Sequence, residues 1–113
     1  MNRTVLNITE KAEYFSKIGM ESAGNGNYTS ALASFDRALK EMPEYAGAWR
    51  EKANCLDAMG RCEDAIRCYD HALQIDPGDA EAWFDKGLTL KKLGNDEEAF
   101  KCMNRGVDLA LGV

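Results

Sequence analysis

The feature that most constrains this chain is a repeat of 34 residues that occurs three times. Trp49 and Trp83 stand one period apart, and Phe15 stands one period before Trp49. An ungapped overlay of residues 46–79 on residues 80–113 gives ten identities, whereas ordinary composition gives roughly two by chance. A fixed period of this size indicates stacked supersecondary units rather than one closed globule. Such proteins work through an extended surface, so the sequence predicts a binding surface rather than a catalytic pocket.

Each 34-residue unit contains two amphipathic helical patterns. Apolar residues recur at spacings of three and four, which is typical of the buried face of a helix. Glycines one period apart separate the two patterns, and a left-handed glycine can end a helix without steric cost. No segment of the sequence shows the alternation of a half-buried strand, so the predicted class is all-α. We expect helices over about residues 10–24, 28–42, 46–59, 62–75, 80–93 and 96–109.

Polar residues before these patterns predict where the helices begin. Asp79 is a good N-cap for the helix that follows it, and Thr9 and Asn27 are plausible caps in the first unit. Asn95, with Glu98 three residues later, resembles a capping box. Each cap would satisfy backbone N–H groups that the first helical turn leaves free.

Small residues recur where the two helices of one unit are expected to cross. A larger side chain there would push the helix axes apart, and such overpacking typically costs ~1–3 kcal/mol. These positions are Gly19, Ala53 and Gly87 in the first helices and Ala31, Ala65 and Ala99 in the second helices.

Length and composition limit the functions that this chain can have. At 113 residues the chain is one domain, and a net charge of −5 without a basic stripe argues against nucleic acid as a partner. No run approaches the ~18 apolar residues of a membrane span, and the first residues do not form a signal peptide, so we expect a cytoplasmic protein. The four cysteines lack the spacing of a zinc site. No nucleophile–base pair or phosphate-binding glycine loop is present, so we expect neither an enzyme nor a metal or cofactor.

The repeated residues resemble the tetratricopeptide repeat, whose pattern runs W-x2-L-G-x2-Y, then A-x3-F, then P. In the second unit, Trp49 and Ala53 stand at the first part of this pattern, Ala65 and Tyr69 at the second, and Pro77 at the third. The first and third units follow in the same register. The resemblance implies a right-handed superhelix of antiparallel helix hairpins, an α-solenoid.

The departures from the pattern are mild. Lys52 and Lys86 replace the usual leucine, Ser22 replaces the tyrosine, and Leu111 stands where proline is expected. We therefore expect a single solenoid domain. Its predicted parts are an N-terminal lead-in over 1–11 and three repeats over 12–45, 46–79 and 80–113.

The resemblance also implies a function. Similar proteins bind a peptide segment of a partner protein in a concave groove lined by the first helix of each repeat, and they act as scaffolds or adaptors. By the repeat register, the residues expected to face this groove are Glu13, Ser16, Lys17, Met20, Arg50, Glu51, Asn54, Asp57, Glu81, Phe84, Asp85, Leu88 and Lys92.

Acidic residues dominate the middle of this set, and Met20, Phe84 and Leu88 offer apolar contacts. We hypothesise a peptide partner that carries Lys or Arg beside an apolar anchor. The alternative is that the charges only solvate an exposed helix face.

One subgroup of similar proteins holds the terminal carboxylates of chaperone tails with lysine, asparagine and arginine. None of these residue types occurs here at the aligned positions, and three of those positions are acidic, so we expect no chaperone carboxylate tail as partner. The aligned residues are Ser16, Met20, Glu51, Glu81 and Asp85.

The last helix carries an apolar stripe that a further helix would normally cover. It consists of Phe100, Met103, Val107 and Leu111. A bare stripe of this kind on a soluble protein usually marks an interaction site. The chain could be a fragment of a longer array, or the stripe could bind a partner. Our second hypothesis is a structural module that forms a homo-oligomer through this face.

Overall fold

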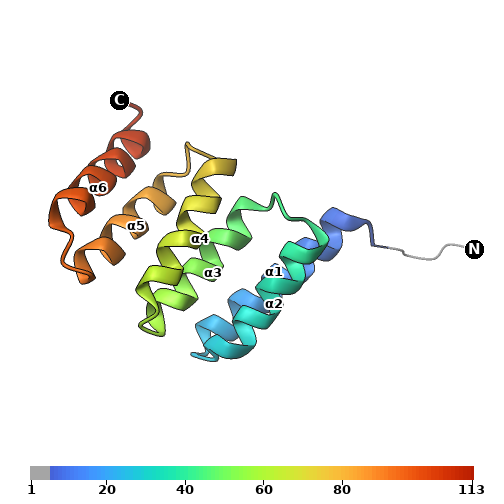
Figure 1. Ribbon diagram of the computed structural model, residues 1–113. Coiled ribbons are helices and arrows are strands. Elements are labelled where there is room, and N and C mark those ends of the chain that lie inside the picture. Colours follow the sequence, from blue (N-terminus) through green and yellow to red (C-terminus); the bar gives the residue numbers. More distant parts are fainter. Residues whose placement is uncertain (1–5) are drawn as a thin grey trace, which may run out of the picture.

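Six helices stacked as three antiparallel hairpins make up the computed structural model, which describes residues 6–113 (Figure 1). α1 packs on α2, α3 on α4 and α5 on α6, while α3 and α5 each also pack on the second helix of the preceding hairpin. The molecule is elongated, at 58 × 31 × 20 Å. No strand occurs among the described residues, and the predicted all-α superhelix is confirmed. The helices are α1 (Ile8–Gly24), α2 (Tyr28–Glu41), α3 (Ala46–Ala58), α4 (Cys62–Ile75), α5 (Ala80–Lys92) and α6 (Asp96–Leu111).

The first helix begins two residues earlier than predicted, at Ile8. The Asn7 side chain accepts a hydrogen bond from the backbone N–H of Glu10 at 2.8 Å, and the Glu10 carboxylate accepts one from the Asn7 N–H at 3.2 Å. This reciprocal pair is a capping box, so the predicted cap at Thr9 is wrong, since Thr9 lies inside the helix. Residues 1–5 of the predicted lead-in lie outside the described residues, and the division into repeats stays a prediction.

The remaining predicted caps divide into two kinds. The Asp79 carboxylate accepts a hydrogen bond from the backbone N–H of Ala82 at 3.1 Å, so this cap is confirmed. Asn27 and Asn95 occupy N-cap positions, but neither side chain makes a capping hydrogen bond. Arg61 stands at the equivalent position of the second hairpin, and α4 begins there in the same register. The turn before these helices, rather than a capping side chain, therefore fixes their first residue.

That turn depends on glycine. Gly26, Gly60 and Gly94 have φ of +79°, +80° and +82°, in the left-handed region predicted for them. A side chain would be strained in this conformation, so the glycines hold the link between the helices of each hairpin.

The small residues lie where the paired helices cross, as predicted. A Cβ on Gly87 would lie 2.4 Å from Cγ of Met103, and a Cβ on Gly19 would lie 2.7 Å from the Phe35 ring. The three alanines of the second helices are fully buried. Side chains larger than these would force the helices of a hairpin apart.

The loops between hairpins are tied to the helix that follows. Nε1 of Trp49 donates a hydrogen bond to the carbonyl oxygen of Pro43 at 2.9 Å, and Nε1 of Trp83 donates to that of Pro77 at 2.8 Å. Phe15, at the equivalent position of the first hairpin, has no such donor. The tryptophans thus do more than fill space, because they fix the entry into α3 and α5. Across residues 6–113, none of the helices combines the length and apolarity that a membrane crossing requires.

Candidate peptide-binding groove

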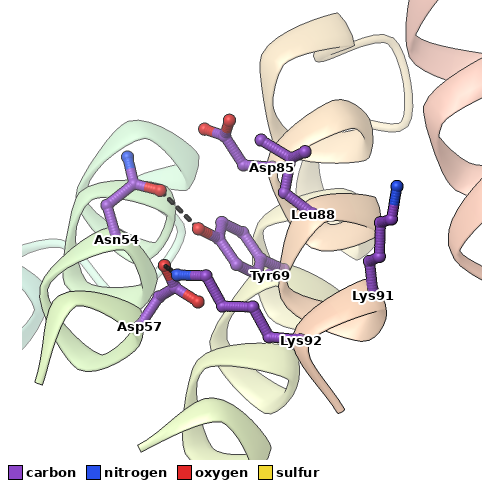
Figure 2. Close-up of a pocket in the computed structure, with 7 residues that line it drawn as sticks. All are labelled: Asn54, Asp57, Tyr69, Asp85, Leu88, Lys91 and Lys92. Atoms are coloured by element: carbon purple, nitrogen blue, oxygen red, sulfur yellow. Dashed lines mark hydrogen bonds and ion pairs between the residues drawn. The ribbon is translucent and has the colours of Figure 1, made fainter. Parts of the chain in front are cut away.

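A pocket of about 610 Å³ lies between α3 and α5 and is called here the groove pocket. Figure 2 shows the Tyr69 ring reaching from α4 into this space, with side chains of α3 on one side and of α5 on the other. We call the side that carries this pocket the groove face, and the opposite side, formed by α2, α4 and α6, the outer face. The lining residues are Asn54, Asp57, Tyr69, Asp85, Leu88, Lys91 and Lys92.

Tyr69 lies at the base of the groove pocket. Its ring is buried, and its hydroxyl donates a hydrogen bond to Oδ1 of Asn54. Burial raises the pKa of the Tyr69 hydroxyl, and the nearby carboxylates of Asp85 and Asp57 raise it further. The group is therefore a neutral donor that sets the position of Asn54 in the groove.

Asp57 joins α3 to α5 across the pocket. The Thr89 hydroxyl donates a hydrogen bond to Oδ1 of Asp57 at 2.8 Å, and Nζ of Lys92 donates to Oδ2 at 2.7 Å. The hydrogen bond to Asp57 raises the pKa of Lys92. Asp57 was expected to add to the acidic middle of the groove, but the Lys92 ammonium neutralises it.

Arg50 forms ion pairs with two further carboxylates, those of Asp79 and Glu51. Its Nη1 donates to Oδ2 of Asp79 at 2.8 Å, and its Nη2 lies 3.4 Å from Oε2 of Glu51. Burial alone would lower the pKa of Arg50, but Asp79, Glu51 and Glu81 outweigh burial and raise it. Glu51 and Asp79 therefore share one guanidinium, and much of their charge is already balanced.

Of the carboxylates that line the groove pocket and the pocket next to it, Glu81 and Asp85 form no ion pair within residues 6–113, whereas Asp57 does. Asp85 is half-buried, and its pKa is raised first by burial and then by Glu81, while Arg50 opposes the rise. A half-buried carboxylate with a raised pKa gains the most from a cation supplied by a ligand.

A second and smaller hollow of about 220 Å³ adjoins Asp85, between α5 and α6. We call it the end pocket. Its walls are mostly apolar, and Asp85 and Glu81 form its polar rim. The lining residues are Ala80, Glu81, Phe84, Asp85, Gly106, Val107 and Ala110. Since Asp85 lines both pockets, one carboxylate stands between two hollows along α5.

The structure brings together only part of the predicted groove set. Glu13 and Lys17 line a separate hollow on α1 with Leu6 and Tyr14, and Met20 is exposed on the same helix. Arg50 and Glu51 line neither pocket; Arg50 pairs with Asp79, the N-cap of α5, and with Glu51. The predicted residues that line the groove pocket or the end pocket are Asn54, Asp57, Glu81, Phe84, Asp85, Leu88 and Lys92.

The expectation for Ser16 is wrong, because its side chain is buried rather than open to the groove. Arg50 and Phe84 stand at the equivalent positions of the later repeats and are half-buried. A side chain as short as serine does not reach the surface from that position.

Two groove-pocket residues were absent from the predicted groove set, Tyr69 and Lys91. The sequence carried a signal for the first, since Tyr69 stands where the first repeat has Phe35. A hydroxyl at a core position needs a hydrogen-bond partner, and the nearest edge of the core is the groove.

The predicted stripe on α6 is mostly open to solvent. Phe100, Val107 and Leu111 are 51%, 43% and 71% exposed. Met103 differs, because it packs against Gly87 inside the hairpin and is half-buried. The exposed end face therefore consists of Phe100, Val107 and Leu111. Between residues 6 and 113, no group of three His, Cys, Asp or Glu side chains is placed to hold a metal ion.

Three family models of the tetratricopeptide repeat match this sequence, over residues 22–72, 54–94 and 80–111. The chain belongs to the tetratricopeptide repeat family. Proteins built on this fold are protein–protein interaction modules, and this chain is one of them.

Known proteins resemble this tetratricopeptide repeat chain over different lengths. An uncharacterised protein of Methanocaldococcus jannaschii, MJ0572, is 41% identical over 56 residues, which are 50% of this chain and 65% of that protein. A crystal structure of MamA is similar at 25% identity and a TM-score of 0.85, over 95% of this chain and 62% of the MamA chain. The chain thus spans less than two thirds of each.

A third relative is similar in fold alone. The first tetratricopeptide repeat domain of Spaghetti (RPAP3), solved with the HSP90 peptide SRMEEVD, matches at 18% identity and a TM-score of 0.88. The match covers 94% of this chain and 84% of that domain.

Proposed function

We propose that this chain binds an extended peptide segment of a partner protein on its groove face, across α3 and α5, as a scaffold or adaptor. The observation that carries the proposal is Asp85, a half-buried carboxylate without an ion pair within residues 6–113, which lines two adjoining pockets. The peptide places a Lys or Arg side chain against Asp85 and Glu81 and an apolar side chain in the end pocket or against Leu88. We assign this interaction to the cytoplasm, with neither nucleic acid nor membrane as partner.

The two contacts contribute differently to affinity. An ion pair at a partly exposed site contributes ~0–1 kcal/mol, because water screens it. Burying an apolar side chain such as leucine contributes ~1.5–3 kcal/mol. The apolar anchor therefore supplies most of the affinity, and the carboxylates of Asp85 and Glu81 select which peptide binds and in which direction it lies.

The same charges oppose acidic tails. The Spaghetti domain was solved with SRMEEVD, a peptide with three acidic side chains and a terminal carboxylate. This chain presents Glu81 and Asp85 where such a peptide would have to lie. We expect no measurable binding of SRMEEVD at concentrations where a selected basic peptide saturates the groove.

A selection from a displayed library of random peptides tests the proposal. We expect the enriched peptides to carry Lys or Arg within a few residues of Leu, Ile, Phe or Met. The double variant Glu81→Lys/Asp85→Lys should lose at least about tenfold in affinity for them, which corresponds to about 1.4 kcal/mol. Enrichment of acidic peptides would contradict the proposal.

A matched control separates the groove from overall charge. The variant Asp36→Lys/Asp70→Lys changes the net charge by the same amount, but on the outer face, where both aspartates pair with lysines. Its affinity for the selected peptide should stay within about twofold of the unmodified chain. An equal loss of affinity in both variants would mean that long-range electrostatic attraction, not contact in the groove, causes the loss.

The end face supports a second candidate function, an assembly module that joins copies of the chain. The exposed side chains of Phe100, Val107 and Leu111 favour it, because soluble proteins seldom leave such a stripe bare. Sedimentation velocity over a range of concentrations measures it directly. Self-association that Val107→Lys abolishes would support this function, and a monomer at every concentration would exclude it.

A further inference from the structure

The outer face carries a pocket of about 380 Å³ where α2, α3 and α4 meet, called here the outer pocket. Its floor is apolar, because Leu56 is buried there and Leu32 and Trp49 pack against the same core cluster. Its rim is cationic, since the side chains of Arg61 and Arg67 are 55% and 69% exposed. An apolar floor beneath a cationic rim fits a ligand that carries an anion beside an apolar group.

Two guanidiniums share one carboxylate at this rim. Nη2 of Arg61 lies 2.8 Å from Oδ2 of Asp64, and Nη2 of Arg67 pairs with Oδ1 of the same residue. Neither arginine forms another ion pair within residues 6–113. Lys52, which also lines the pocket, is already paired with Asp36. One positive charge therefore stays unbalanced at the outer pocket, in a chain whose net charge is −5.

The stacking of the hairpins does not require this arrangement. Asn27 and Asn95 stand one period before and one period after Arg61. Ala33 stands one period before Arg67. The first hairpin thus lacks both cations and the third lacks one, although all three hairpins fold and stack alike.

Arg61 is also a costly residue for the helix that it precedes. It is the N-cap residue of α4, and its side chain makes no capping hydrogen bond. The partial positive charge at a helix N-terminus disfavours a cation there, whereas asparagine is among the best caps. A residue that opposes its own helix, at a position where the other repeats carry asparagine, is typical of a functional site.

An aromatic pair gives the outer pocket a firm wall. The rings of Trp49 and His71 are stacked, with centroids 4.3 Å apart and planes 12° from parallel. The indole of Trp49 is itself fixed by its hydrogen bond to the carbonyl oxygen of Pro43. Because this wall is already ordered, a ligand loses less conformational entropy on binding than it would at a mobile surface.

We propose that the outer pocket binds a phosphorylated serine or threonine side chain of a partner protein. The phosphate lies between Arg61 and Arg67, and an apolar side chain of the same segment lies over Leu32 and Leu56. A phosphate carries nearly two negative charges and three acceptor oxygens, so it accepts hydrogen bonds from both guanidiniums while Asp64 holds them in place. A single carboxylate gains little at so exposed a site, because water screens it.

This site is separate from the groove pocket, and its occupation does not depend on peptide binding there. The groove face is acidic at Glu81 and Asp85, whereas the outer pocket is cationic. One chain can therefore hold two segments of opposite charge on its two faces.

A library of synthetic peptides with one fixed phosphoserine and random flanking residues tests the proposal. We expect the retained peptides to carry Leu, Ile, Phe or Met within a few residues of the phosphoserine. The same peptides with serine or glutamate in its place should bind at least about tenfold more weakly. Inorganic phosphate alone should also bind at least about tenfold more weakly than the phosphopeptide.

Variants of the protein locate the phosphate. Arg61→Asn, which introduces the residue of the other two repeats, should weaken the phosphopeptide at least about tenfold without lowering the melting temperature. Arg67→Ala, which introduces the residue of the first repeat, serves as a second variant. The matched control is Arg105→Asn, which removes the same charge from an exposed position of α6 outside the pocket. Its affinity should stay within about twofold of the unmodified chain.

The two tryptophans locate the apolar part of the peptide. Trp49 borders the outer pocket and Trp83 does not. In the isotope-labelled chain, we expect the phosphopeptide to shift the indole N–H signal of Trp49 and to leave that of Trp83 unchanged. The backbone amide signals of Asp85 and Leu88 in the groove should stay unchanged as well.

Three outcomes would overturn the proposal. Equal binding of the unphosphorylated peptides, or full affinity in both Arg61→Asn and Arg67→Ala, would show that the guanidiniums do not hold a phosphate. Shifts confined to Asp85 and Leu88 would assign the phosphopeptide to the groove. Inorganic phosphate that binds as tightly as the phosphopeptide would show that the pocket takes a free anion and not a segment of a partner protein.

Discussion

The outer face and the groove face differ in whether their aspartates form ion pairs. On the outer face, Nζ of Lys52 lies 2.8 Å from Oδ1 of Asp36, and Nζ of Lys86 lies 2.6 Å from Oδ1 of Asp70. These two pairs are one period apart. On the groove face, Asp85 has no ion pair among residues 6–113, and its pKa is raised by burial and by Glu81.

The outer-face contacts recur from repeat to repeat, whereas the groove residues differ between repeats. The outer lysines also lie over the Trp49 and Trp83 rings, with Nζ 5.4 Å and 5.9 Å from the ring centroids. The same lysine, aspartate and tryptophan recur in successive repeats, so they belong to the stacking of the hairpins. Groove positions change from repeat to repeat, as Lys17, Glu51 and Asp85 do at one register position. Such variation is what recognition of a particular partner needs.

The largest effect on stability should come from Asp57, a groove residue that, unlike Asp85, forms an ion pair. Replacing Asp57 with alanine removes the charged acceptor of the buried Thr89 hydroxyl at 2.8 Å, leaves that hydroxyl only the Asp85 carbonyl oxygen at 3.1 Å, and removes the partner of Lys92. We expect a loss of about 1–3 kcal/mol in the free energy of unfolding, measured by urea denaturation. A loss below about 0.5 kcal/mol would show that the contacts of Asp57 with Thr89 and Lys92 contribute little to stability.

Removing the Tyr69 hydroxyl should have a smaller effect. The variant Tyr69→Phe keeps the buried ring but loses the hydrogen bond to Asn54. We expect a loss of about 1 kcal/mol in the free energy of unfolding, because Asn54 can turn to water. Binding of the selected peptide should weaken as well, since Asn54 loses its fixed position. Unchanged binding with reduced stability would limit Tyr69 to a structural role.

Breaking the ion pair between Asp70 and Lys86 on the outer face should reduce stability less still. Replacing Asp70 with alanine breaks its contact with Lys86, and half of the Asp70 side chain is exposed. We expect a loss of at most about 1 kcal/mol in the free energy of unfolding and no change in peptide affinity. A clear loss of affinity would place part of the binding surface on the outer face.

The smallest effect, and the one of opposite sign, should come from Asp85. Its raised pKa means that the folded chain binds the proton more readily than the unfolded chain, so the charged carboxylate reduces stability at neutral pH. Asp85→Asn should therefore stabilise the chain at pH 7, by less than about 1 kcal/mol because the site is partly exposed. The gain should vanish below about pH 4, where the carboxyl is neutral in both states. A gain that persists at low pH would point to packing instead of charge.

The helices followed closely from the sequence, because glycine turns and small crossing residues recur every 34 residues. α4 (Cys62–Ile75) lies where it was predicted, and α2 and α3 end one residue before their predicted last residue. The capping side chains were less predictable. Thr9 and Asn7 are both good caps, and only the path of the backbone before α1 decides between them.

The site was predictable in outline only. The register located Asn54, Asp57, Asp85 and Leu88 on the groove face, since helix periodicity fixes which side a residue faces. The pairing of charges depends on side-chain reach between helices, as for Lys92 and Asp57, which are 35 residues apart in sequence. Periodicity carries no information about such pairs, so the neutralised and the free carboxylates could not be told apart.

A structure of the chain with a peptide from the library selection would show directly whether the groove face binds peptide. The peptide should lie across α3 and α5, with a Lys or Arg side chain on Asp85 and an apolar side chain in the end pocket or on Leu88. A peptide bound along α2 and α4, or one that leaves Asp85 uncovered, would contradict this prediction.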